Sequence, residues 1–164
     1  MPLYLRNKSV LTAIYLSIVV ILYIIAKFFH IAPNIIPLLI PIFIPLLDNL
    51  YYSIIFTVGF LFIMSIFGFF IQVSSLIFLF FIPIIVFTYS KKIKYIITSL
   101  TAFISTMIIT KFYYFLIPEY MKNNFMLYFL IIFYVLGINI YGLIILELAG
   151  KVENYLKKYY GGDE

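Results

Sequence analysis

The chain has 164 residues, of which 66% are hydrophobic and 10% are charged, and its mean hydropathy is +1.19. Soluble domains carry roughly 25% charged residues, so this composition excludes a soluble globular protein and predicts an all-α integral membrane protein with the lipid bilayer as its main partner. The net charge of +5 comes from a few loops and the C-terminal tail, not from a basic face, which argues against nucleic acid as a partner.

The apolar runs predict a single transmembrane helical bundle over residues 1–148. They do not alternate polar and apolar side chains as the strands of a β-barrel would. After a basic leader, the first run has a longer core than a signal peptide and no small-residue cleavage site, which predicts an uncleaved helix. Either Asp48 or Asn49 is predicted to cap the start of the next helix. The predicted spans are approximately residues 9–29, 31–47, 50–70, 73–89, 95–117 and 125–148. The turn between the third and fourth spans is predicted at Gln72, Ser74 and Ser75.

The second span is unusual because four prolines recur at intervals of four residues, at Pro33, Pro37, Pro41 and Pro45. A proline inside a helix has no N–H, so the carbonyl four residues earlier loses its usual donor. Here that carbonyl belongs to the preceding proline, which predicts a column of unpartnered carbonyls along one face. Two interpretations stay open: a kinked helix packed against donors from its neighbours, and a broken helix whose carbonyls face a cavity or a solute.

The positive residues predict the topology, because lysine and arginine are enriched on the cytoplasmic side of a membrane. The basic leader, the loop Ser90–Lys94 and the tail should therefore share that side. An even number of crossings must separate the leader from the loop. The first, third and fourth predicted spans make three, so the proline segment must be the fourth crossing. This gives six spans in the cell membrane with both termini cytoplasmic, whereas a re-entrant proline segment would leave five. Residues 149–164 are predicted to form a basic amphipathic tail on the membrane surface.

Lys111 is the one clearly intramembrane charge, and it is either functional or long enough to reach the outer interface. Its helix carries a row of small and hydroxyl side chains at a spacing of four: Thr98, Ala102, Thr106 and Thr110. A comparison of the depths of the two segments in the membrane predicts that this face lies beside the proline segment. Its hydroxyls would then donate to the carbonyls around Pro37 and Pro41. In the alternative, the hydroxyls bond carbonyls of their own helix.

Asn139 is a further candidate, because a mid-span asparagine faces either a polar cavity or another helix, and Gly137 and Gly142 beside it allow a close neighbour or a ligand. The candidate binding residues are therefore Pro37, Pro41, Thr106, Thr110, Lys111 and Asn139.

No catalytic or metal-binding constellation is found in the sequence. There is no cysteine, His30 is the single histidine, and four of the six acidic residues lie at or beyond Glu147. The membrane spans therefore lack the paired carboxylates that acid–base or metal chemistry needs. We predict no enzyme activity, no cofactor and no metal.

The predicted function is a small transport component that binds a solute in the bundle. Six crossings with both termini cytoplasmic is similar, in size and topology, to the substrate-binding subunits of energy-coupling-factor vitamin transporters. The row from Ala13 to Ser17 faintly resembles their small-residue docking motif, although their usual glycine-rich loops are absent. The alternative is a structural or accessory subunit bound to other membrane subunits. A polar cavity bounded by Pro37, Lys111 and Asn139 would favour the first hypothesis, and a packed bundle the second.

Overall fold

The computed structural model describes residues 7–30, 32, 35–90, 93–116, 119, 122 and 124–160, and these residues form helices and no strand. The predicted all-helical fold is thus confirmed. In chain order the elements are α2 (Lys8–Phe28), α3 (Ile35–Leu39), the 3-10 turn η1 (Ile40–Ile42), α4 (Phe43–Leu47), α5 (Leu50–Ile66), α6 (Phe70–Leu76), the π-helical turn η2 (Ile77–Phe81), α7 (Ile82–Tyr89), α8 (Lys94–Phe112), the 3-10 turn η3 (Tyr114–Leu116) and α9 (Asn124–Tyr160).

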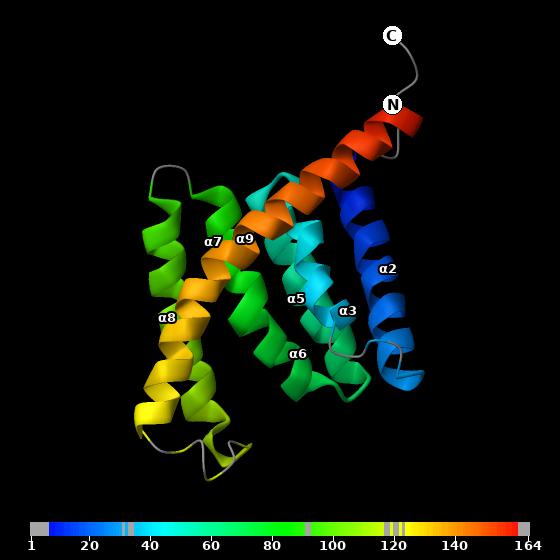
Figure 1. Cartoon of the computed structure of the whole chain (residues 1–164). Coiled ribbons are helices and arrows are strands. Elements are labelled where there is room, and N and C mark those ends of the chain that lie inside the picture. The colour runs from blue at the N-terminus through cyan, green and yellow to red at the C-terminus, as the bar shows by residue number, and fades with distance from the viewer. Residues whose placement is uncertain are drawn as a thin grey trace.

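Successive segments of the bundle run in alternating directions (Figure 1). The helices α2, α5 and α8 run one way, and the proline segment, the α6–α7 run and α9 run back. Four helical runs are long and apolar enough to cross a membrane: α2, α6–α7, α8 and α9. The proline segment Ile35–Leu47 and α5 are apolar but shorter. At 1.5 Å per residue they reach about 20 and about 26 Å, less than the roughly 30 Å hydrocarbon layer.

The turn between α5 and α6 lies at Phe67–Phe69, earlier than the sequence predicted. Gly68 has φ of 81°, a left-handed conformation that glycine adopts without strain. The predicted turn residues lie inside α6 instead, where serine hydroxyls bond the carbonyl of Ile71 at 2.9–3.0 Å. Such local bonds make serine compatible with a helix, which explains why the prediction from Gln72, Ser74 and Ser75 was wrong.

The core lies where α2, α4, α5 and the α6–α7 run meet, and aromatic rings dominate it. Phe81 stacks on Phe60 and Phe56 with ring centroids 5.7 and 6.2 Å apart, and Tyr23 meets Phe60 edge-on at 5.7 Å. All four side chains are almost fully buried. Each such pair contributes about 0.5–1.5 kcal/mol beyond the burial of its area, so this cluster helps to fix how α2, α5 and the α6–α7 run pack together.

The last helix, α9, is continuous over 37 residues and is thus about 56 Å long. The structure shows no boundary at residue 148, so the predicted surface tail is not a separate helix. Figure 1 shows α9 crossing the face of the bundle obliquely and extending past it, near the start of α2. Residues 151–158 are exposed there, with ion pairs Lys151–Glu147 and Lys157–Glu153 at 2.7 Å.

Gly142 allows α9 to approach α7 closely. A Cβ atom at this position would lie 2.8 Å from the ring of Phe87, whereas a Cβ at Gly137, further back on the same helix, would meet nothing within 4 Å. Packing therefore requires glycine at position 142 but not at position 137.

We expect Gly142→Ala to destabilise the bundle by about 1–3 kcal/mol, because the added methyl overpacks the contact with Phe87. The matched variant Gly137→Ala should be stabilising by up to about 1 kcal/mol, because alanine is the better helix former and the site has room. Thermal unfolding in detergent micelles measures both. A lower Tm for the variant at 137 than for the one at 142 would contradict this packing.

Candidate functional site

The proline segment returns to the beginning of α2. Asp48, at its end, takes the left-handed conformation with φ of 45° and turns the chain into α5. Lys8 Nζ donates to the carbonyl of Asp48 at 3.0 Å, and Ser9 Oγ donates to the hydroxyl of Tyr52 at 3.3 Å. The side chain of Asn49 accepts from two backbone N–H groups of α5, as a helix cap does. The segment therefore ends beside the first turn of α2.

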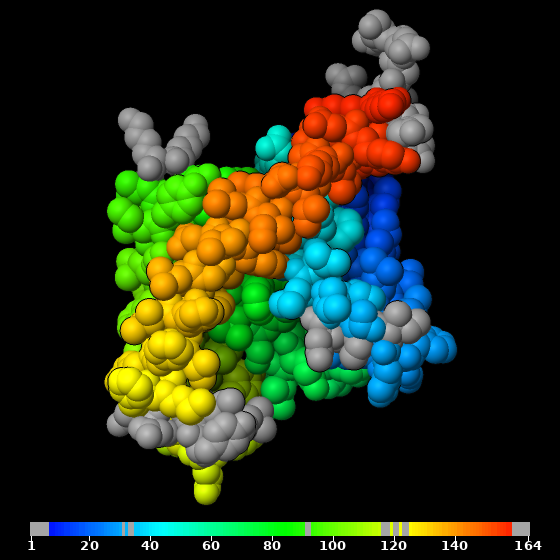
Figure 2. All heavy atoms as spheres, in the orientation of Figure 1, coloured from blue at the N-terminus to red at the C-terminus, as the bar shows by residue number. Residues whose placement is uncertain are grey.

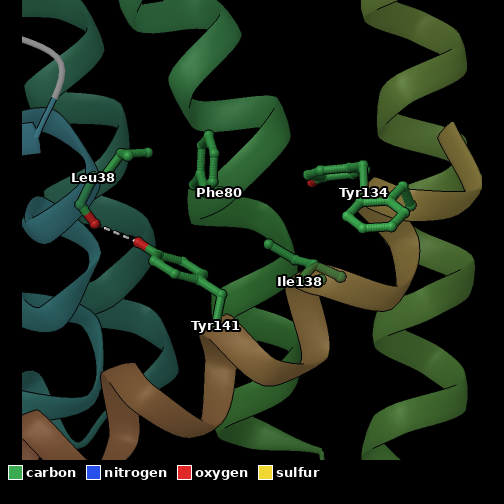
Figure 3. Close-up of a pocket in the computed structure, with 7 residues that line it drawn as sticks. Leu38, Phe80, Tyr134, Ile138 and Tyr141 are labelled. Atoms are coloured by element: carbon green, nitrogen blue, oxygen red, sulfur yellow. Dashed lines mark hydrogen bonds between the residues drawn. The ribbon is translucent and has the colours of Figure 1, made fainter. Parts of the chain in front are cut away.

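The prolines divide this segment into three pieces, α3, η1 and α4. The segment is therefore a broken helix and not one continuous helix with a kink. In the 3-10 turn, hydrogen bonds reach three residues back, so the donor for the carbonyl of Leu38 would be the nitrogen of Pro41. That nitrogen has no hydrogen. The hydroxyl of Tyr141, on α9, donates to the Leu38 carbonyl in its place (Figure 3).

A second carbonyl is freed where the segment ends. The N–H of Asp48 donates to the carbonyl of Pro45 at 3.1 Å and is therefore not available to Ile44, four residues before it. The Ile44 carbonyl accepts instead from Ser53 Oγ at 3.2 Å and from the hydroxyl of Tyr89 at 3.3 Å. These two side chains come from α5 and α7, so one carbonyl joins three segments.

Pro83 creates the same situation in another helix. It follows the π-helical turn η2 and lies four residues after Leu79, so it leaves the Leu79 carbonyl without its usual donor. The hydroxyl of Tyr134, on α9, donates to that carbonyl. Tyr134 and Tyr141 therefore attach α9 to two different proline-broken segments.

The hydroxyl-rich face of α8 does not provide these donors, and the prediction that it would was wrong. The main packing partners of α8 are α7, η2 and α9. Thr101 and Thr106 donate to the carbonyls four residues back in α8, at 2.8 and 2.7 Å. A threonine hydroxyl reaches its own helix without any partner, whereas the longer tyrosine can span the gap to a neighbouring helix. The alternative given above is confirmed for these two residues.

The six candidate residues do not assemble into one site. Pro37 and Pro41 are buried in the proline segment, whereas Lys111 is exposed near the end of α8, and Thr106 and Thr110 are partly buried along that helix. Asn139 donates to Ser99 Oγ at 2.8 Å and so joins α9 to α8.

An apolar recess lies between α3, η2 and α9, and we call it the α9 recess. Its volume is about 280 Å³, and it is lined by Leu38, Phe80, Phe133, Tyr134, Gly137, Ile138 and Tyr141. Figure 2 shows the green α6–α7 run at its floor, between the orange α9 and the cyan proline segment. Figure 3 shows Phe80 between Leu38 and Tyr134. The recess therefore opens where the proline segment meets the part of α9 around Asn139.

Sequence reasoning missed the two tyrosines that border this recess. One signal was available for Tyr134: applying the proline rule to Pro83 as well as to the proline segment marks the Leu79 carbonyl as one that needs a donor. Tyr134 and Tyr141 are also seven residues apart, which places them on the same face of a helix.

Comparison with protein-family models, with curated proteins and with solved structures finds no match for this chain. Within the described residues, no group of three histidine, cysteine or acidic side chains could hold a metal ion.

We expect Tyr141→Phe and Tyr134→Phe each to destabilise the bundle by about 0.5–1.5 kcal/mol, because each removes the hydrogen bond that a tyrosine hydroxyl donates to a backbone carbonyl. Tyr128→Phe is the matched control, since its side chain is 56% exposed on the same helix. Thermal unfolding in one detergent compares the three. Equal effects of all three substitutions would show that the hydroxyl contacts with Leu38 and Leu79 contribute nothing.

Proposed function

We propose that all six helical segments cross a membrane and that both termini lie on its cytoplasmic side. The main support is the contact between Lys8 and the Asp48 carbonyl, because it brings the end of the proline segment back to the start of α2. The start of α8 at Lys94 and the basic end of α9 lie at this same end of the bundle (Figure 1). Basic residues are enriched on the cytoplasmic side of a membrane. A single orientation of the bundle therefore places all three basic regions, at the starts of α2 and α8 and at the end of α9, on that side. The shorter segments, α5 and Ile35–Leu47, would cross with help from their flanking residues.

Within this topology we propose a non-enzymatic membrane component that binds a molecule in the bundle, as a transport system requires of its binding subunit. The observation that carries the proposal is the α9 recess. It lies beside a broken helix, and broken helices at membrane depth form the binding sites of many transporters. Small-molecule sites are concave and mostly apolar, and they lie between the helices of bundles. The site would be the recess itself and not the six polar and proline positions, which are scattered.

A structural or accessory subunit of a larger membrane complex is the second candidate. The scattered positions favour it, since Lys111 is exposed and Asn139 is engaged with Ser99. It is also favoured by the outer face of α8, where large apolar side chains are exposed and no charge interrupts them before Lys111: Ile96, Leu100, Phe103, Ile104 and Met107.

Single-cysteine variants test the topology, because the chain has no cysteine of its own. In intact cells, a membrane-impermeant maleimide should label His30→Cys and Phe67→Cys. It should label Tyr51→Cys, Ser90→Cys and Glu153→Cys only after lysis. Labelling of the Tyr51 and Ser90 variants in intact cells would mean that the proline segment does not cross.

Native mass spectrometry of the protein, purified in mild detergent from its own membranes, separates the two candidate functions. The proposed binding role predicts one small molecule retained per chain by the wild type and lost in Gly137→Phe, whose side chain would fill the recess. Gly150→Phe is the matched control, because a Cβ there also meets nothing within 4 Å but the position lies outside the recess. A chain that carries only other protein subunits would support the accessory role and contradict the binding role.

A further inference from the structure

The α9 recess presents almost nothing that a polar molecule could use. Its only side-chain polar atoms are the hydroxyls of Tyr134 and Tyr141, and each already donates its proton to a backbone carbonyl. Those hydroxyls can still accept a hydrogen bond but have no proton left to give. A carboxylate, phosphate or sugar would lose its bonds to water without replacement, which costs several kcal/mol. A hydrocarbon has no such requirement.

The recess also lies at the depth where the bilayer offers only hydrocarbon. Phe80 is near the middle of the apolar run Phe70–Tyr89, so at 1.5 Å per residue about 15 Å of helix separates it from either end. Under the proposed topology this is the centre of the roughly 30 Å hydrocarbon layer. Molecules there are lipid chains and the helices of other proteins.

The size of the recess distinguishes between these two occupants. One turn of an α-helix, about 10 Å wide and 5.4 Å long, occupies on the order of 400 Å³. The recess holds about 280 Å³ and is bounded by three segments, so a partner helix would cover it without filling it. The methylene groups of one lipid chain can enter a space of this volume.

We infer that the α9 recess holds one acyl chain of a membrane phospholipid, lodged between the proline segment and α9. This inference rests on the proposed function and names the class of molecule bound. Gly137 is the positioning residue, because its missing side chain leaves open the space beside Ile138 that the chain would occupy.

Photolabelling in reconstituted vesicles tests this inference. The full-length protein is placed in phosphatidylcholine vesicles in which one acyl chain carries a diazirine at its middle, and labelled residues are mapped by mass spectrometry after illumination. We expect label on Phe80, which is half-buried and borders the recess, and on Phe103, which is 42% exposed on the outer face of α8. In Gly137→Phe the label on Phe80 should be lost while that on Phe103 remains. Gly150→Phe should retain both.

Each outcome has one meaning, because Phe103 reports on insertion and folding while Phe80 reports on the recess. Label on Phe103 with none on Phe80 in the wild type would overturn the acyl-chain inference and leave the membrane topology intact. Label on Phe80 in these vesicles but none on it in native membranes, with Phe103 labelled in both, would show that a partner helix covers the recess and would overturn the inference. Persistent label on Phe80 in both Gly137→Phe and Gly137→Leu would also overturn it. Absence of label on both residues would instead overturn the membrane proposal.

Discussion

A backbone carbonyl inside a folded helical bundle needs a hydrogen-bond donor, and where the helix does not supply one a neighbouring segment must. Proline removes donors, and this chain places four prolines in one segment and another in α7. The structure meets the requirement with tyrosine hydroxyls from neighbouring helices, which bond the carbonyls of Leu38, Ile44 and Leu79. Tyr89 and Tyr141 thereby hold α7 and α9 against the proline segment, and Tyr134 holds α9 against η2.

The path of α9 shows this dependence most directly. A helix of 37 residues could lie against the bundle at many angles, but two of its hydroxyls must reach carbonyls on different segments. Gly142 adds a third condition, because the close contact with Phe87 holds only if that position carries no side chain. Three contacts along α9 fix an oblique crossing, which takes the basic end of α9 toward the start of α2.

The sequence was sufficient for the features that depend on composition and on local chemistry. Apolar runs predicted the helical fold, and Asn49 was recognised as a cap from its residue type alone. The proline spacing indicated that the carbonyls of the prolines would need donors from elsewhere, whereas the carbonyls of this segment that accept from other segments are those of Leu38 and Ile44. The spacing could not indicate which helix would supply the donors, and the matching of depths pointed to the face of α8 that carries Thr106 and not to Tyr141. The decisive difference is reach: Thr106 is satisfied by Ala102 within its own helix, whereas Tyr141 extends across to Leu38.

The requirement to satisfy carbonyls also explains the chemistry of the α9 recess. Were the hydroxyls of Tyr134 and Tyr141 not engaged, the recess would offer two donors and could attract a polar molecule or water. Because each proton is committed to a freed carbonyl, the space between the two tyrosines is left with carbon surfaces and acceptor lone pairs. Under the proposed binding role, the broken helices would act indirectly: their carbonyls are not presented to a ligand, but they occupy the hydroxyl protons of Tyr134 and Tyr141 that a ligand could otherwise have used.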